Sequence, residues 1–346
     1  MLESPPQPED SATGDGEDWR IYLGTGRPHN GVERLPEPPQ WRRFGGGPLI
    51  TSALPEDRQG AERARGYQIT DEAIEMVNAA LYLRRPLLVT GKPGTGKSTL
   101  AYSVAYELGL GPVLYWPVTS RSTVDDGLYR YDAIGRLQET NLFQSTGRTE
   151  EIPDIGRYLT LGPLGTALLP WARPRVVLID ELDKSDLGLP NDLLNVFEEG
   201  RFEIPELARL PEDQSLAEVM TSDGTLRAPV RRGQVRCAAF PVVVITSNAE
   251  REFPPAFLRR CLRLDIQPPD EQALTQIITS MLGEEAVAAS ADLITHFLDL
   301  RDRGAVATDQ LLNAIFLVTS GVRPPESTRA RLRANLIRDL EAAGTL

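Results

Sequence analysis

The sequence predicts an α/β protein in which helices cover both faces of a parallel sheet, followed by a small α-helical domain. Four short apolar stretches lack the polar alternation of a half-exposed strand, and helical patterns separate them, which indicates a sheet buried on both faces. After residue 268, in contrast, only helical stripes of apolar residues occur. The four predicted strands are residues 85–90, 112–116, 175–179 and 241–245.

The helices around these strands follow from apolar spacing and from their starting residues. One helix is expected to begin near Thr70 or Asp71, with apolar residues three and four positions apart on one face. A second is expected over residues 98–108, where apolar residues recur every four positions.

Composition divides the chain into three parts. Residues 1–65 are rich in proline, glycine and acidic residues, so we expect a partly disordered N-terminal arm. Within it, residues 4–18 are expected to be disordered, and residues 19–50 to pack aromatic side chains against the folded body. Residues 66–268 form the predicted α/β core with insertions, and residues 269–346 form the helical domain.

The overall composition excludes several classes of protein. The 346 residues are 41% apolar and 25% charged, as in ordinary soluble globular proteins. Two distant cysteines cannot make a disulfide framework, and two histidines leave little material for a histidine metal site. No secretory signal and no apolar run long enough to span a bilayer are visible. We therefore expect a cytoplasmic protein.

The charged residues carry two further indications. A formal net charge of −12 argues against broad, sequence-independent binding of nucleic acid. Of the 37 basic residues, only Lys92, Lys97 and Lys184 are lysines. Where arginine replaces lysine at exchangeable positions, the lysines that persist are candidates for chemistry that needs a compact ammonium group. Two of the three lie in one eight-residue motif.

That motif, residues 91–98, reads Gly-Lys-Pro-Gly-Thr-Gly-Lys-Ser and lies between a predicted strand and a predicted helix, the context of a phosphate-binding loop, or P-loop. Its glycines permit a turn whose backbone N–H groups point at phosphate oxygens. Lys97 is expected to reach the β- and γ-phosphates, and the Ser98 hydroxyl to ligate Mg²⁺. The expected nucleotide-contacting residues here are Gly91, Pro93, Gly94, Thr95, Gly96, Lys97, Ser98 and Thr99.

Two other predicted strands end in polar residues suited to hydrolysis of a phosphate anhydride. Asp180 and Glu181 follow one strand, and we expect Asp180 to hold Mg²⁺ and Glu181 to act as general base on a water molecule. Asn248 follows another strand; an asparagine there is by itself more often a turn residue, but beside the other two motifs it is expected to hold that water. Arg259 and Arg260 could reach the phosphate of a neighbouring subunit, the alternative being a surface salt bridge.

Together these motifs resemble those of the AAA+ ATPases, and within them the MoxR-like branch, over residues 66–346. The resemblance implies an αβα P-loop NTPase sandwich followed by a helical lid, assembled as a ring that is usually hexameric. It makes residues 91–98 the Walker A motif, Asp180 with Glu181 the Walker B motif, and Asn248 sensor 1. It also implies adenine as the base, and an arginine finger at Arg259 or Arg260, with Arg260 preferred.

The resemblance is weaker at two places. For sensor 2 the lid offers Arg303 and Arg323, and Arg303 is preferred. Residues 180–185 resemble a family segment in which an arginine is common where Lys184 stands, and Asp183 is expected to help position Lys184 at a subunit contact.

Two insertions interrupt the predicted core. Residues 121–172 resemble the helix-2 insert of the MoxR-like branch, and Tyr129 and Tyr131 could face a pore or, the favoured interpretation, pack the insert onto its own core. In the other, residues 201–204 and 230–235 are expected to pair as a hairpin across a loop.

The resemblance thus implies a Mg²⁺-dependent ATPase ring that remodels or activates a protein client, such as a protein with a von Willebrand A domain, without a nucleic-acid or membrane partner. Two alternatives remain open. One is a nucleic-acid motor, against which the acidic balance argues. The other is a switch that binds ATP with little turnover, against which the presence of Glu181, Asn248 and Arg260 argues.

Overall fold

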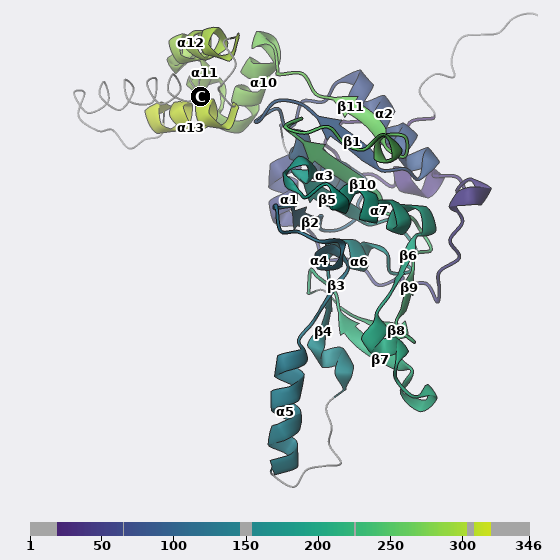
Figure 1. The fold of residues 1–346 in the computed structure, drawn as a ribbon. Coiled ribbons are helices and arrows are strands. Elements are labelled where there is room, and N and C mark those ends of the chain that lie inside the picture. Colours follow the sequence, from purple (N-terminus) through teal and green to yellow (C-terminus); the bar gives the residue numbers. More distant parts are fainter. Residues whose placement is uncertain (1–18, 65, 146–153, 225, 303–307, 320–346) are drawn as a thin grey trace, which may run out of the picture.

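The computed structural model describes residues 19–64, 66–145, 154–224, 226–302 and 308–319, arranged as in Figure 1. Its centre is a five-stranded parallel sheet in the order β11-β1-β10-β5-β2, so the predicted α/β class is confirmed. The strands are β1 (Leu87–Thr90), β2 (Leu114–Pro117), β5 (Val176–Asp180), β10 (Val242–Ser247) and β11 (Leu262–Asp265).

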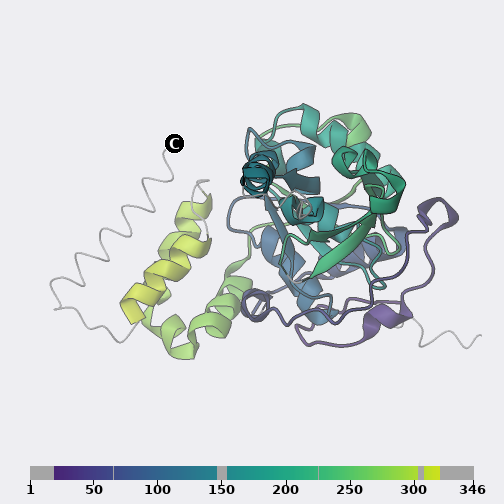
Figure 2. The ribbon, with the colours of Figure 1, turned by 90° about the horizontal axis from the view of Figure 1, so that it is seen from below.

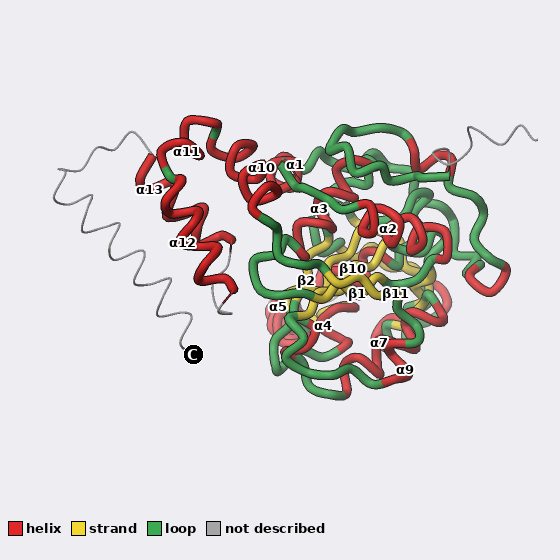
Figure 3. Tube along the Cα trace, turned by 90° about the horizontal axis from the view of Figure 1, so that it is seen from above, coloured by secondary structure: helices red, strands yellow, loops and turns green. Residues whose placement is uncertain are grey.

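Side chains of the sheet alternate between two apolar cores, one on each face. Along β5, Val177 and Ile179 pack into one core, and Val176 and Leu178 pack into the other. Figure 3 shows the strands lying between helices. The first core is covered by α6 (Pro163–Ala167), α7 (Gly188–Glu199) and α9 (Pro255–Leu258), and the second by α2 (Asp71–Leu83) and α3 (Lys97–Glu107).

The parallel strand β11 is an element that the sequence analysis missed. Its residues, Leu-Arg-Leu-Asp, alternate apolar and polar side chains, and only Leu264 is fully buried. Such alternation is what an edge strand shows, since one of its faces meets solvent. A search for uniformly apolar runs therefore finds the interior strands and the other edge strand, β2, whose exposed positions are Tyr115 and Pro117, and overlooks β11, which pairs with β1 at the edge.

The described part of the N-terminal arm is built into the folded body through buried hydrogen bonds. The Asn78 side chain, fully buried in α2, accepts from the backbone N–H groups of Ile21 and Tyr22 at 2.6 and 3.0 Å. The buried carboxylate of Glu107 accepts from the backbone N–H groups of Leu23 and Gly24 at 2.6 and 3.0 Å. Four consecutive backbone N–H groups of the arm, from Ile21 to Gly24, thereby have acceptors in α2 or α3.

Some aromatic side chains of the arm pack against the folded body and others do not. Tyr22 is fully buried, and Phe44 stacks on Phe240 with ring centroids 5.5 Å apart. Trp41, however, is 79% exposed, so the expectation that it packs against the body is wrong. The arm carries η1 (Gly31–Arg34), η2 (Gln40–Arg42) and α1 (Arg58–Ala64). The predicted disorder of residues 4–18 concerns a segment outside the described residues.

The two insertions meet in a second sheet of six strands, in the order β3-β4-β7-β8-β9-β6. The predicted pairing is confirmed, because Phe202 of β6 lies opposite Val235 of β9. The segment between them is not the expected loop, since it contains β7 and most of β8, which pair antiparallel with each other. The strands are β3 (Tyr129–Tyr131), β4 (Leu159–Leu161), β6 (Arg201–Glu203), β7 (Leu216–Met220), β8 (Arg227–Arg231) and β9 (Gln234–Arg236).

Short helices and one long helix complete the insertions. In Figure 1 the long helix, α5 (Ala133–Ser145), extends away from the body, and none of its residues is buried. The short elements are α4 (Val124–Leu128), η3 (Ile155–Tyr158), α8 (Pro205–Ala208) and η5 (Glu212–Gln214), while η4 (Leu182–Lys184) lies between the insertions, just after β5.

The insert tyrosines pack onto the protein's own core, which is the favoured interpretation above. Tyr129 stacks on Phe202 with ring centroids 6.4 Å apart, and its hydroxyl donates to Glu206 at 2.9 Å. The Tyr131 hydroxyl accepts from Arg136 at 3.1 Å, and both rings lie against the core of the first sheet face.

The C-terminal helices form a separate small core, which agrees with the predicted helical region after the α/β core. Figure 2 shows them beside the α/β body. They are α10 (Glu271–Leu282), α11 (Glu284–Ala289), α12 (Ala291–Asp302) and α13 (Thr308–Thr319), and their shared core includes Leu274, Phe297 and Leu311. Among the described residues, no helix combines the length and the apolar character needed to cross a membrane.

The buried Asn78 gives a test of the arm's attachment. Asn78→Ala should lower the free energy of unfolding by about 2–4 kcal/mol, because the N–H groups of Ile21 and Tyr22 lose their acceptor in a buried site. Denaturant unfolding followed by circular dichroism measures the change. Asn141→Ala, the same substitution at an exposed position of α5, should change stability by less than about 0.5 kcal/mol. Equal losses in the two variants would contradict the attachment.

Candidate functional site

The loop between β1 and α3 wraps around the ammonium group of Lys97. Lys97 is buried, and its Nζ donates to the carbonyl oxygens of Gly91 and Lys92 at 2.8 Å each. Burial lowers the pKa of Lys97, while the nearby carboxylates of Asp183 and Asp180 act in the opposite direction. The loop thus holds one cation at its centre.

Glycine is required at the start of this loop. Gly91 has a φ of +149°, and a Cβ atom added there would overlap the Ile266 carbonyl oxygen. The loop ends at Gly96, whose φ of +85° lies in the left-handed region, and α3 then begins at Lys97. No side chain caps this N-terminus, so its first backbone N–H groups present partial positive charge to an anion such as phosphate.

Asp180 joins three other elements at the carboxyl end of β5. Its Oδ1 accepts from Ser98 Oγ of α3 at 2.6 Å and from Thr246 Oγ1 of β10 at 2.7 Å. Its Oδ2 accepts from the hydroxyl of Tyr115 in β2 at 3.2 Å. Because parallel strands all end at one edge of the sheet, residues far apart in sequence meet at this carboxylate.

The donor set around Asp180 fits Mg²⁺ bound together with phosphate. Mg²⁺ prefers oxygen ligands and is commonly held by one or two carboxylates plus substrate phosphates. Ser98 Oγ and Asp180 supply a hydroxyl and a carboxylate side by side. Within the described ranges no group of three or more histidine, cysteine, aspartate or glutamate side chains could hold a metal unaided. Phosphate oxygens and water molecules would complete the coordination.

Glu181 follows Asp180 in a left-handed backbone conformation, with φ 59° and ψ 48°. Its backbone N–H donates to Thr246 Oγ1 at 2.8 Å. Its carboxylate accepts from Lys184 Nζ at 2.6 Å and, at the longer distance of 3.5 Å, from Asn248 Nδ2. The structure therefore brings the expected general base and the expected water-holding amide together. Non-glycine residues in this conformation often mark functional sites.

Asp183 has a different task from the expected one. Its buried carboxylate accepts from the backbone N–H groups of Asn248 and Glu250 at 2.9 and 3.1 Å, so it fixes the turn after β10. The partner of Lys184 is Glu181 instead, and this bond raises the pKa of Lys184. The expectation that Asp183 positions Lys184 is wrong. The sequence analysis missed the role of Asp183 because its partner, the backbone N–H of Asn248, is 65 positions away in the chain.

The remaining predicted residues lie at various distances from this centre. Pro93 is exposed, the Thr95 hydroxyl donates to the Lys92 carbonyl oxygen at 2.9 Å, and Thr99 is half-buried in the first turn of α3. The lid candidates Arg303 and Arg323 lie outside the described residues.

Arg259 and Arg260 follow α9, and their side chains form no hydrogen bond or ion pair with the P-loop, Asp180 or Glu181 within the described ranges. Arg259 is exposed. Arg260 instead donates from Nε to Glu198 Oε1 at 2.9 Å, so the surface salt bridge considered above is present.

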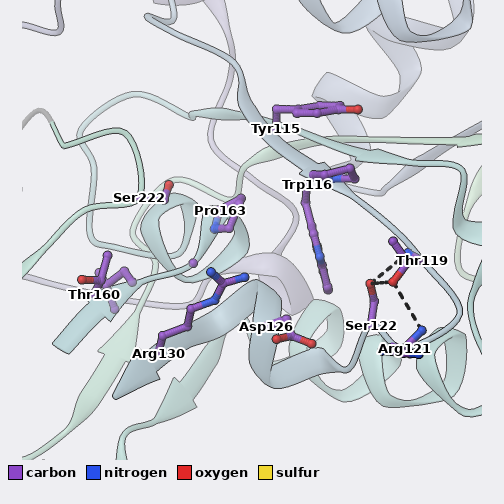
Figure 4. A pocket seen from close by; sticks show the side chains of 13 residues that line it. Tyr115, Trp116, Thr119, Arg121, Ser122, Asp126, Arg130, Thr160, Pro163 and Ser222 are labelled. Carbon is purple, nitrogen blue, oxygen red and sulfur yellow. Dashed lines mark hydrogen bonds between the residues drawn. The ribbon is translucent and has the colours of Figure 1, made fainter. Parts of the chain in front are cut away.

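A pocket of about 510 Å³ borders the site through Tyr115 and went unnoticed in the sequence. Figure 4 shows its lining, with Arg130 from β3 and Asp126 from α4 beneath Tyr115 and Trp116. Its occupant would touch the same tyrosine whose hydroxyl bonds Asp180.

The strain and crowding at Gly91 generate a prediction about phosphate binding. Gly91→Ala should reduce affinity for ADP by about tenfold or more, equal to about 1.4 kcal/mol, because the loop must move away from Ile266. Titration calorimetry measures the affinity. Gly109→Ala separates strain from crowding, since Gly109 also has positive φ (+61°) but has open space around its Cβ position. Gly109→Ala should lower the free energy of unfolding by about 1–2 kcal/mol and leave the affinity for ADP unchanged. If Gly91→Ala also left the affinity for ADP unchanged, the assignment of residues 91–98 as the phosphate-binding loop would be contradicted.

Comparison with known proteins agrees with this geometry. No curated protein matches the chain. Residues 86–261, about half of the chain, match the AAA domain (dynein-related subfamily), and this range contains the P-loop, Asp180, Glu181, Asn248 and both finger candidates. The chain therefore belongs to the dynein-related subfamily of AAA domains, the group that includes the MoxR-like AAA+ ATPases.

Proposed function

We propose that this protein is a Mg²⁺-dependent ATPase of the MoxR-like type, which assembles as a hexameric ring and uses ATP hydrolysis to remodel or activate a protein client in the cytoplasm. The observation that carries the proposal is the convergence on Asp180, where Ser98 of the P-loop helix and Thr246 of β10 both donate to one carboxylate oxygen. The next residue, Glu181, lies against Asn248. This arrangement supplies metal ligands and a general base side by side.

Each residue then has a chemical task. Lys97 and the N-terminus of α3 bind the phosphates, and their positive charge favours the transition state of phosphoryl transfer. Ser98 and Asp180 would hold Mg²⁺, which would supply Lewis-acid polarisation of phosphate oxygens. Glu181 takes a proton from the attacking water, and Asn248 orients that water.

The bond from Lys184 to Glu181 suits this task. Because Lys184 contacts Oε2, the other oxygen, Oε1, remains directed toward Asn248.

The finger candidates support hydrolysis completed by a neighbouring protomer. Arg259 and Arg260 lie after α9 and do not contact their own P-loop in the described residues. An arginine placed this way reaches a phosphate only in another protomer, as in NTPases that receive an arginine finger in trans. Arg260 is the preferred finger, and Arg303 of the lid the proposed sensor 2. A client with a von Willebrand A domain is proposed from the family resemblance alone.

Glu181→Gln is the variant that tests the proposed ATPase most simply. Turnover should fall about 100-fold or more, because the amide cannot accept the proton from water, while ATP affinity should remain within a few-fold of wild type. Phosphate release and titration calorimetry measure the two quantities.

Glu252→Gln, at an exposed position in the same region, should behave as wild type. Turnover that is equally fast in Glu181→Gln would rule out Glu181 as the base. A wild-type protein that binds ATP without releasing phosphate would favour the switch over the ATPase.

A further inference from the structure

Three charged side chains link the N-terminal arm to the preferred arginine finger. Arg42 of η2 lies 3.9 Å from Glu198 Oε1, and the same oxygen accepts from Arg260 Nε at 2.9 Å. We propose that Glu198, held in place by Arg42, is the positioning residue that aims Arg260 at the nucleotide of a neighbouring protomer. This inference rests on the proposed function and adds to it a role for the arm.

Arg260 is anchored through two of its nitrogens, Nε and Nη1, and its remaining N–H groups are available. Its Nε donates to Glu198, and its Nη1 donates to the Ala256 carbonyl oxygen at 3.3 Å. A guanidinium has five N–H donors, so these two bonds leave three for a phosphate, including both on Nη2. The side chain is 42% exposed, and its free edge is thus accessible to a second protein chain. Because these bonds already fix the side chain, Arg260 loses little conformational entropy when it binds a phosphate.

Glu198 is in turn fixed from the arm. Arg42 is only 6% exposed, and its Nη1 donates to the Phe197 carbonyl oxygen at 2.7 Å, at the end of α7. Its guanidinium also lies over the Phe240 ring, 5.6 Å from the centroid. Burial lowers the pKa of Arg42, and the carboxylate of Glu198 opposes that shift. Because a buried charge is costly without an opposite charge nearby, Arg42 holds the carboxylate of Glu198 beside it.

The backbone of the finger segment is fixed independently by Arg85. Its Nε donates to the Arg260 carbonyl oxygen at 3.1 Å, and its Nη2 contacts the carbonyl oxygens of Arg259 and Cys261. Arg85 stands just before β1, the strand that leads into the P-loop. Arg42 and Arg260 thus flank Glu198, and Arg85 holds the backbone of the finger segment, a gathering of positive charge that suits a phosphate.

Steady-state hydrolysis provides the first test. Glu198→Gln keeps the shape of the side chain and removes its charge, so the turnover number should fall roughly 10- to 100-fold through misplacement of Arg260. The KM for ATP, the affinity for ADP and the oligomeric state should not change. Glu199→Gln is the matched control, since Glu199 is the adjacent residue and pairs with Arg201 at 2.6 Å. Equal turnover in the two variants would overturn the proposal.

Mixed assemblies separate a positioning role from a merely structural one. A Glu198→Gln protomer has an intact nucleotide site and a misplaced finger, whereas a Glu181→Gln protomer has an inactive site and a well-placed finger. Where the two adjoin, the finger of Glu181→Gln completes the site of Glu198→Gln. Turnover of the mixture should therefore exceed the average of the separate variants several-fold. No recovery in assemblies shown by mass photometry to be mixed would overturn the proposal.

A parallel mixture distinguishes failure of this inference from failure of the proposed function. Arg260→Ala mixed with Glu181→Gln should also recover turnover, because it tests the finger itself. If turnover recovers in the mixture with Arg260→Ala but not in the mixture with Glu198→Gln, Arg260 remains the finger and the positioning role of Glu198 is contradicted. Recovery in neither mixture would remove action in trans, and the inference would fall with it. Arg42→Met, which keeps an apolar stem, should show the Glu198→Gln pattern, and wild-type turnover in that variant would overturn the arm's role.

Discussion

The carboxylate of Asp180 is the point on which the arrangement of the site depends. It accepts hydrogen bonds from the hydroxyl groups of Ser98, Thr246 and Tyr115. These residues belong to the P-loop helix and to the strands on either side of β5. In a parallel sheet these elements end at one edge, and a single acceptor there fixes their relative positions. The P-loop helix, the proposed general base Glu181 and the proposed water-holding amide of Asn248 are therefore held within one hydrogen-bonded network rather than on separate loops.

The same sheet connects this network to the segment proposed to face a neighbouring protomer. β1 carries Gly91 at its carboxyl end and Arg85 just before its amino end, where Arg85 holds the carbonyl oxygens of the finger segment. A single strand thus spans from the nucleotide site of one protomer to the group proposed to act on the next. The arm adds Arg42 beside Glu198, so a segment that precedes the AAA domain in sequence contributes to the proposed positioning of the finger.

The sequence predicts those parts of the molecule whose partners are close along the chain. The P-loop and the four apolar strands have local signatures, namely glycine spacing and unbroken apolar runs. The edge strand β11 escapes because it alternates, and the pair of Arg42 with Glu198 escapes because nothing in the spacing of residues so distant reveals a contact. Lys184 shows the limit most clearly: its motif indicates a special lysine, but only the folded turn shows that its partner is Glu181 rather than Asp183.

The most direct test of the central role of Asp180 is the Mg²⁺ dependence of nucleotide binding in the wild type and in Asp180→Asn. Asparagine can still accept from Ser98 and Thr246, so the network can form, but the negative charge that attracts the metal is lost. Titration calorimetry with ATP, in Mg²⁺ and in EDTA, should show tighter binding with Mg²⁺ in the wild type and no such difference in Asp180→Asn. An equal effect of Mg²⁺ in both proteins would contradict the account.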